Sequence, residues 1–273
     1  MVLNANKEEI FRTPPLKILV VDDDEMNRRM MRLLLTRDGH DVQLAGNGLE
    51  ALDAVKYQRY DVVFMDLQMP VMDGLEASRR IRDWENGGLR TYIIALTASY
   101  LPEEGHLLFA AGIDNYVAKP FEVDHIKRLL ALIARGEMTA SDKGPAAPDH
   151  PSQADEILDI DRGTQRVGGD PETYKELLSD FIDELPERIR TLEKLSQQRD
   201  MTSLSRAAHN LKGVSLNLGA LQLSEYASKL DKQSNEGYTD QNQALLLELK
   251  RAESNLEKSA TKFLTKEKKV ASA

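Results

Sequence analysis

Short apolar runs alternate with amphipathic stretches through the first half of the chain. Five runs rich in valine, isoleucine and leucine have the length of buried strands, and they cover residues 16–21, 42–45, 62–65, 92–96 and 115–118. The amphipathic stretches predict helices over residues 26–37, 48–59, 74–82, 107–111 and 122–135. Strands that alternate with helices form parallel sheets covered on both faces. We therefore predict an α/β domain over residues 16–135 with a doubly wound, five-stranded parallel sheet.

The pattern changes after residue 155, because no strand-like run follows. Asp170 and Pro171 are the residue types of a helix N-cap and first helical position. The periodicity predicts one short helix and four long ones, over residues 160–167, 171–198, 201–217, 220–235 and 240–264. Pro186 falls inside the first long helix, where we expect a kink or break. Residues 156–264 are thus predicted to form an all-α, antiparallel four-helix bundle.

Three remaining segments show no apolar periodicity. Residues 1–15 are polar and end in two prolines, residues 136–155 are rich in glycine, proline and alanine, and residues 265–273 are basic. We interpret them as a flexible lead-in, a semi-stiff linker between the two domains, and a frayed tail.

Composition narrows the class of protein. The 273 residues carry a formal net charge of −9 with a pI near 5.2, which argues against a nucleic-acid-binding surface. There is no cysteine for disulfide or thiol chemistry. No apolar run approaches membrane-spanning length. We therefore expect a cytoplasmic, monomeric protein without a nucleic-acid or membrane partner.

Four of the predicted strands end in polar residues that suit a single chemical site. Asp22 and Asp23 follow the first strand, Asp66 ends the third, and Thr97 and Lys119 follow the fourth and fifth. The carboxyl ends of parallel strands meet at one edge of a sheet. Clustered carboxylates favour Mg²⁺, and the lysine and hydroxyl can bind an anion. The pattern indicates phosphoryl transfer to a carboxylate nucleophile.

These residues resemble the receiver domain of bacterial response regulators. The resemblance rests on the acidic pair, on the D-x-x-M-P-x-x-D-G sequence from Asp66 to Gly74, on a Thr-Ala pair at Thr97 and on a Lys-Pro pair at Lys119. It implies a flavodoxin-like fold with Asp66 as the phosphoacceptor. It also implies that Thr97 and Lys119 bind the phosphoryl oxygens.

The resemblance further implies how the metal and the switch are built. Asp22, Asp23 and Asp66 would hold Mg²⁺, with Asp23 more direct than Asp22, and the backbone carbonyl of Gln68 would add another oxygen. Thr97 and Tyr116 would be the switch residues.

A competing interpretation is an aspartyl phosphatase of the haloacid dehalogenase type. That class places its nucleophile and acid two residues apart after the first strand, and Asp22 and Asp24 have this spacing. The sequence around Asp66 would then be unexplained.

The predicted helix that contains His209 carries a second candidate site. At about 100° per residue, its bundle-facing stripe comprises Leu204, Ala208, Leu211, Ser215 and Leu218. His209 lies about 140° from Leu204 and is predicted to point outward. Lys212, Gly213 and Leu216 share its neighbourhood, where a lysine can neutralise a phosphoryl group and a glycine permits close approach. The alternative is an ordinary surface histidine.

The H-x-x-K-G sequence at His209, followed by Asn217-Leu218-Gly219-Ala220, resembles the histidine phosphotransfer (Hpt) domain. This resemblance implies that His209 is phosphorylated on an imidazole nitrogen and that Lys212 assists.

A receiver followed by an Hpt domain is similar to the C-terminal part of hybrid sensor kinases and predicts a two-component phosphorelay protein. A sensor histidine kinase would act upstream, and another receiver or Hpt domain downstream. We find no glycine-rich nucleotide-binding pattern, so we expect no ATP-dependent kinase activity. The alternatives are a phosphorylation-switched binding module with His209 as a phosphate sink, and an Mg²⁺-dependent aspartyl phosphatase.

Transfer also requires the two sites to dock. Met26 and Leu33 fall on a side of the first helix apart from its sheet-facing stripe, and we predict that this apolar side lies beside Asp66. Gly213 and Leu216 are the predicted counterpart on the bundle.

Overall fold

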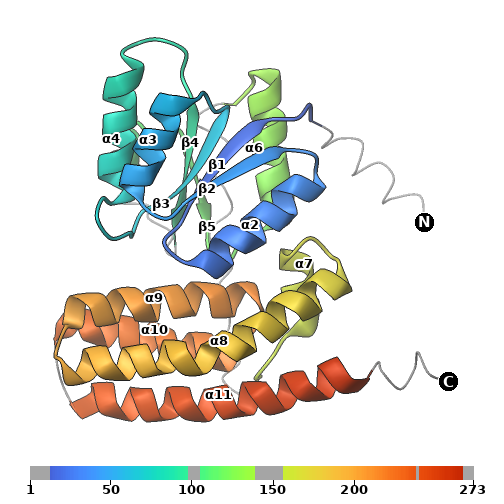
Figure 1. Cartoon of the computed structure of the whole chain (residues 1–273), viewed down its shortest axis with the longest axis vertical. Coiled ribbons are helices and arrows are strands. Elements are labelled where there is room, and N and C mark those ends of the chain that lie inside the picture. The colour runs from blue at the N-terminus through green and yellow to red at the C-terminus, as the bar shows by residue number, and fades with distance from the viewer. Residues whose placement is uncertain (1–12, 98–104, 139–155, 238–239, 267–273) are drawn as a thin grey trace. The chain divides into compact units, whose positions relative to one another are not determined.

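The computed structural model describes residues 13–97, 105–138, 156–237 and 240–266 (Figure 1). The chain forms two compact units, Met1–Asp149 and His150–Ala273. Most of the predicted lead-in, linker and tail lies outside the described residues. Among the described helices, none combines the length and apolar character needed to cross a bilayer.

The first unit is the predicted five-stranded parallel sheet. Its strands are β1 (Lys17–Val21), β2 (Asp41–Ala45), β3 (Val62–Asp66), β4 (Tyr92–Thr97) and β5 (Asn115–Ala118). They are ordered β2-β1-β3-β4-β5, and every neighbouring pair is parallel. The strand order reverses direction between β1 and β3, which is where doubly wound sheets place their ligands.

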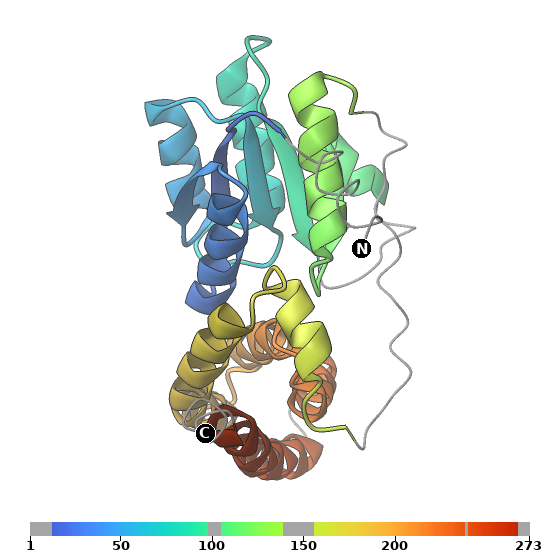
Figure 2. The same ribbon diagram turned by 90° about the vertical axis from the view of Figure 1, so that its right-hand side faces the viewer.

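Helices cover both faces of this sheet (Figures 1 and 2). They are α2 (Glu25–Arg37), α3 (Gly48–Tyr57), α4 (Gly74–Glu85), α5 (Gly105–Ala110) and α6 (Val123–Arg135). The fourth of the predicted helices thus begins two residues early, and the third extends three residues beyond its predicted end. The extension stops where Asn86 adopts a left-handed conformation with φ 41°.

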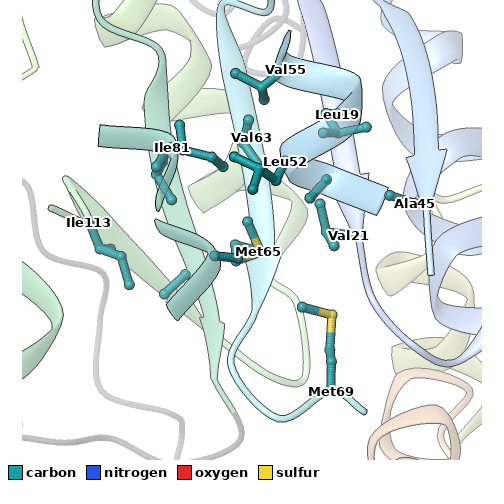
Figure 3. Close-up of a cluster of buried hydrophobic side chains, with 14 of the residues drawn as sticks. Leu19, Val21, Ala45, Leu52, Val55, Val63, Met65, Met69, Ile81 and Ile113 are labelled. Atoms are coloured by element: carbon teal, nitrogen blue, oxygen red, sulfur yellow. The ribbon is translucent and has the colours of Figure 1, made fainter. Parts of the chain in front are cut away.

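Alternate residues of each strand enter different cores, as the period of a strand requires. One core joins β1 and β3 to α3 and α4 (Figure 3), and includes Leu19, Val21, Val63, Met65, Leu52 and Ile81. The other joins the same strands to α2 and α6, and includes Ile18, Val20, Val62, Phe64, Leu35 and Ile126. The sheet is therefore held rigidly from both sides.

The second unit is the predicted helical bundle. It comprises α7 (Ile160–Arg166), α8 (Pro171–Gln197), α9 (Met201–Asn217), α10 (Leu221–Glu236) and α11 (Asp240–Lys266). Each long helix contacts two others, since α8 packs on α9, α9 on α10, α10 on α11 and α11 on α8. Figure 2 views these four helices nearly end-on, around a common axis. Asp170 caps α8 as expected, accepting hydrogen bonds from the N–H groups of Glu172 and Thr173.

Of the kink or break predicted at Pro186, the break does not occur, because α8 runs unbroken through this residue. Pro186 is exposed, so water can reach the carbonyl group that loses its helical partner. Leu185, Ile189 and Leu192 around it are buried, and their packing maintains the helix.

Candidate phosphoacceptor and phosphohistidine sites

The four polar strand ends of the first unit meet at one edge of the sheet. Asp22 follows β1, Asp66 ends β3, Thr97 ends β4, and Lys119 follows β5. The strand register aligns these ends, since Asp66 pairs with Leu96 and Thr97 pairs with Ala118. The sheet itself therefore brings together residues that lie up to 97 positions apart in the sequence.

Lys119 binds two carboxylates at the centre of this edge. Its Nζ lies 2.7 Å from Asp22 Oδ2 and 2.6 Å from Asp66 Oδ2. All three side chains are at most 3% exposed. Buried charges are tolerated only when paired and hydrogen-bonded. Lys119 thus holds Asp66 in an ordered, negatively charged environment.

The carboxylates at this edge of the sheet carry more negative charge than Lys119 neutralises. Burial, reinforced by the charge of Asp66, raises the pKa of Asp22 to about 7, although Lys119 opposes this shift. Burial alone would lower the pKa of Lys119, but the two carboxylates outweigh it and raise that pKa well above its usual value. The lysine is therefore a permanent cation that does not neutralise the whole group.

The same edge provides a group of oxygen ligands. One carboxylate oxygen from each of Asp22, Asp23 and Asp66 lies within 4.8 Å of the others. Oxygen ligands in this number fit a small, hard divalent cation such as Mg²⁺. Asp66 Oδ1 also accepts a hydrogen bond of 3.2 Å from the N–H of Gln68, which follows the strand.

Asn27 of α2 is a further part of this site that the sequence interpretation did not identify. Its Nδ2 donates to Asp22 Oδ1 at 3.2 Å, and the N–H of Asp24 donates to the same oxygen at 2.9 Å. Arg28 donates to the backbone carbonyl of Asp22 at 2.5 Å. Because Lys119 binds Oδ2, both carboxylate oxygens of Asp22 accept hydrogen bonds from the protein. A buried polar residue in the sheet-facing stripe of α2 was the signal that could have revealed this role.

Gly74 explains the glycine of the D-x-x-M-P-x-x-D-G sequence. A Cβ at this position would lie 2.1 Å from the carbonyl oxygen of Asp66. The N–H of Gly74 donates to the carbonyl of Leu67 at 3.1 Å, which closes the loop over the end of β3. Only a residue without a side chain permits this approach.

Thr97 and Tyr116, the predicted switch residues, both lie in the buried sheet. Thr97 ends β4, and its carbonyl oxygen accepts a hydrogen bond of 2.6 Å from the N–H of Lys119. Tyr116 lies in β5 and is 6% exposed. The peptide bond between Lys119 and Pro120 is cis. Residues 98–104, which join Thr97 to α5, lie outside the described part of the chain.

The predicted docking residues differ in exposure. Met26 is buried rather than outward-facing, because it lies four residues before Met30 and therefore only about 40° from the buried stripe of α2. Leu33 is half-buried. On the bundle, Gly213 is buried and Leu216 is half-buried.

In the second unit, the histidine of the H-x-x-K-G sequence lies against a neighbouring helix. His209 is 9% exposed instead of pointing into solvent as predicted. Its Nδ1 lies 3.1 Å from Oδ2 of Asp231 in α10, so the imidazole turns toward that helix. Lys212, one turn along α9, is half-buried. The spacing placed Leu204, Ala208 and Leu211 correctly in the buried stripe.

Asp231 and Ser205 are the residues of this site that sequence reasoning missed. Ser205 Oγ donates to Asp231 Oδ1 at 2.7 Å, and it lies one turn before His209 on α9. No local pattern links Asp231 to His209, since 22 residues and a turn separate them. Only the packing of α9 on α10 brings them together.

The two folds match two domain families of two-component signalling. Residues 18–131 match the family described as the response regulator receiver domain, and residues 176–258 match the family described as the Hpt domain. The first unit therefore contains a receiver domain and the second an Hpt domain.

Among curated proteins, the chain is similar to sensor histidine kinases. It is 29% identical to the sensor histidine kinase GacS of Pseudomonas protegens over 80% of its own length, and 31% identical to AruS of Pseudomonas aeruginosa over 81%. The chain spans only 24% and 22% of the lengths of these relatives. Among solved structures, it is 37% identical to the receiver domain of a Pseudomonas aeruginosa sensor histidine kinase with coordinated magnesium. That match covers 45% of this chain and 99% of the other, with a TM-score of 0.41.

Proposed function

We propose that this chain is a phosphorelay protein. Asp66 accepts a phosphoryl group from the phosphohistidine of an upstream sensor histidine kinase. His209 then carries the group to an aspartate in another receiver, and the relay continues from there. The observation that carries the proposal is the placement of Lys119 Nζ at 2.6 Å from the Asp66 carboxylate, in a chain that also has an Hpt histidine.

The first step is attack by a carboxylate oxygen of Asp66 on phosphorus. The oxygen–phosphorus bond forms as the phosphorus–nitrogen bond of the donor phosphohistidine breaks, and the imidazole leaves. Lys119 already lies beside the nucleophile and neutralises charge on the transferred oxygens, assisted by the Thr97 hydroxyl. Burial of this edge strengthens each of these interactions.

A divalent cation would complete the receiver site. Asp23, Asp66 and the backbone carbonyl of Gln68 would hold Mg²⁺. Asp22 would act less directly, because its two oxygens accept three protein hydrogen bonds, whereas those of Asp66 accept two. When bound, the cation supplies positive charge against the phosphoryl oxygens.

The second step transfers the group to His209. A lone pair of the imidazole attacks phosphorus, the acyl phosphate bond breaks, and the carboxylate of Asp66 returns to its ion pair with Lys119. Lys212, one turn from His209, neutralises phosphoryl charge on the bundle side.

Phosphorylation of Asp66 also shifts the receiver between two states. Thr97 would move toward the phosphoryl group and Tyr116 would rearrange with it, because β4 and β5 connect both residues to the site. Amide hydrogen exchange should therefore change along residues 105–118 on phosphorylation.

The test follows labelled phosphate into a second protein. Wild-type chain labelled at Asp66 with radioactive acetyl phosphate is mixed with an isolated receiver domain from a relay partner. We expect the label to appear on that receiver, and His209→Gln to abolish this transfer while Asp66 stays labelled. Release of label only as free phosphate would identify a phosphatase. Retention of the label on wild-type Asp66 would identify a switched binding module.

A further inference from the structure

His209 has a carboxylate partner, Asp231, to which the transfer steps of the proposed relay assign no role. Asp231 Oδ2 lies 3.1 Å from His209 Nδ1. Its other oxygen accepts a hydrogen bond of 2.7 Å from Ser205 Oγ and a longer one of 3.4 Å from Asn235 Nδ2. Side chains of both α9 and α10 thus hold the Asp231 carboxylate in place.

This contact determines which nitrogen carries the proton. A carboxylate only accepts hydrogen bonds, so it pairs with a ring nitrogen that bears hydrogen. Neutral imidazole has one N–H and one lone pair. With the hydrogen on Nδ1, the lone pair of His209 lies on Nε2, on the side of the ring away from Asp231.

Asp231 is suited to this role because it stays ionised. Burial would raise the pKa of Asp231, but the hydrogen bonds from His209 and Ser205 and the charge of Lys212 outweigh it and lower that pKa below its usual value. The carboxylate therefore faces the imidazole as an anion at neutral pH.

We propose that Asp231 is a positioning residue that holds His209 in the Nδ1–H tautomer and stabilises the positive imidazole of the phosphorylated form, with Ser205 fixing the carboxylate. The inference deepens the proposed phosphorelay function and rests on it for its kinetic part. Nε2 attacks phosphorus, the acyl phosphate bond to Asp66 breaks, and its electron pair returns to the carboxylate. The Nδ1 proton remains between His209 and Asp231 throughout.

Two consequences follow for the relay. Without Asp231, the lone pair is divided between two nitrogens, so a smaller fraction of His209 is ready to attack. The phosphoimidazole also loses its counter-charge, so the equilibrium between the two carriers moves toward Asp66. A carboxylate that only joined two helices would change neither the tautomer nor this distribution.

The test begins with the imidazole itself. Nitrogen chemical shifts of His209 are measured by NMR in the full chain, and the His209→Gln variant assigns the signal. We expect the Nδ1–H tautomer in the wild type, a mixture of tautomers in Asp231→Asn, and an intermediate result in Ser205→Ala. An Nε2–H tautomer in the wild type would overturn the inference whether or not any variant folds.

The kinetic part uses the same variants in a single-turnover assay. Transfer from phosphorylated Asp66 to His209 should slow by about tenfold in Asp231→Asn, the lower end of the loss seen when a group that orients a metal-binding imidazole is removed. The fraction of label on His209 at equilibrium should fall, and Asp231→Glu should restore part of both. Glu225→Gln is the matched control, since Glu225 lies on the same helix and pairs with exposed Lys229.

Two results would contradict the positioning role of Asp231. A third result would contradict the phosphorelay function without deciding the role of Asp231. An unchanged tautomer in a folded Asp231→Asn chain, or a rate within about twofold of wild type, would overturn the inference. If wild-type His209 accepts no phosphate, the proposed function fails. The tautomer measurement then still decides whether Asp231 orients the ring.

Discussion

The two candidate sites differ in how much charge surrounds the nucleophile. At the receiver edge, Asp66 lies among two further carboxylates and a buried lysine. In the bundle, the carboxylate that pairs with His209 within the described residues is Asp231. A carboxylate that attacks an anionic phosphoryl group needs strong positive compensation. An imidazole begins neutral and becomes positive, so one anion suffices. The charge of the nucleophile thus explains the composition of each site.

The largest expected effect separates the sites completely. Asp66→Asn should reduce labelling by acetyl phosphate by more than about 10³-fold, because an amide is a poor nucleophile. Chelation of divalent cations with EDTA should have the same effect on wild type, since we propose that a divalent cation completes the carboxylate site. His209→Gln should leave the labelling of Asp66 intact. Normal base-labile phosphate on the Asp66→Asn chain would show that the acceptor is another residue.

The next effect concerns docking between the sites. Leu33 on α2 and Gly213 on α9 are the proposed contact positions. Leu33→Asp and Gly213→Gln should each slow transfer from Asp66 to His209 by about tenfold or more, because they place charge or bulk in an apolar contact.

Two controls keep the docking test specific. Labelling of Asp66 should survive Leu33→Asp, and the helicity of the bundle should survive Gly213→Gln. Leu49→Asp is a matched control, because Leu49 is an exposed leucine on a different helix, α3. Normal transfer in both docking variants would exclude this surface.

Alanine substitutions at Gly74 and Gly219 compare how tightly the backbone packs in each unit. A Cβ at Gly74 would lie 2.1 Å from the Asp66 carbonyl, and one at Gly219, where φ is 74°, would lie 2.2 Å from the Asp159 carbonyl. Each alanine substitution should destabilise its own unit by about 1–3 kcal/mol, because the added carbon overlaps a backbone carbonyl oxygen, and at Gly219 the left-handed conformation adds strain. Trp84 in α4 is the single tryptophan, so its fluorescence reports unfolding of the receiver within the full chain.

Far-UV circular dichroism follows the bundle in the same experiment. Gly74→Ala should lower the midpoint of the unfolding transition of the receiver, and Gly219→Ala should lower that of the bundle. Gly136→Ala is the control for strain alone, because its φ is 69° and no atom lies within 4 Å of the added carbon. Equal shifts in both transitions for either variant would contradict independent packing.

The smallest expected effect is a pH dependence confined to the receiver. Burial lowers the pKa of His40 and of His125 below the ordinary value of 6.5. Their unfolded forms therefore bind protons at a higher pH than their folded forms do. This contribution to stability is present above pH 6.5 and is lost as the pH falls below it.

The raised pKa of Asp22, about 7, acts in the opposite sense in the same unit, because its folded form keeps its proton to a higher pH than its unfolded form does. The histidine contribution is therefore measured as a difference between two chains, by urea unfolding followed by Trp84. Between about pH 7.5 and about pH 5.5, the midpoint of His40→Gln relative to wild type should rise, because the variant lacks one of the two histidine contributions. The lowered pKa of Asp231 acts at much lower pH, below its usual 3.8, so the bundle should not share this contribution. An identical pH dependence of the midpoint in wild type and His40→Gln would contradict the assignment.

Residues whose role depends on their position at a strand end were predictable from sequence. The end of a parallel strand is set by its own apolar run, and the sheet edge then assembles Asp22, Asp66 and Lys119 without further information. The five strands, the helices and the bundle followed from periodicity for the same reason.

Roles that depend on packing between helices were not predictable. Asp231 lies on a different helix from His209, and nothing in its neighbours along the chain marks it. Periodicity also predicted that His209 points outward. The core-facing stripe of α9 does not reveal that α10 covers the neighbouring side of the helix, where His209 lies. The contact of Asn27 with Asp22 was missed, and a break at Pro186 was wrongly allowed, for a similar reason, since each depends on the surface that packs around it.

The most direct test is a time course of phosphoryl transfer within the full chain. Radioactive acetyl phosphate is added with Mg²⁺, samples are quenched at intervals, and base-labile acyl phosphate is separated from base-stable phosphohistidine. We predict that acyl phosphate on Asp66 appears first and declines as phosphohistidine on His209 rises, and that Asp66→Asn forms neither. Phosphohistidine that appears at the wild-type rate in Asp66→Asn would contradict the path from Asp66 to His209.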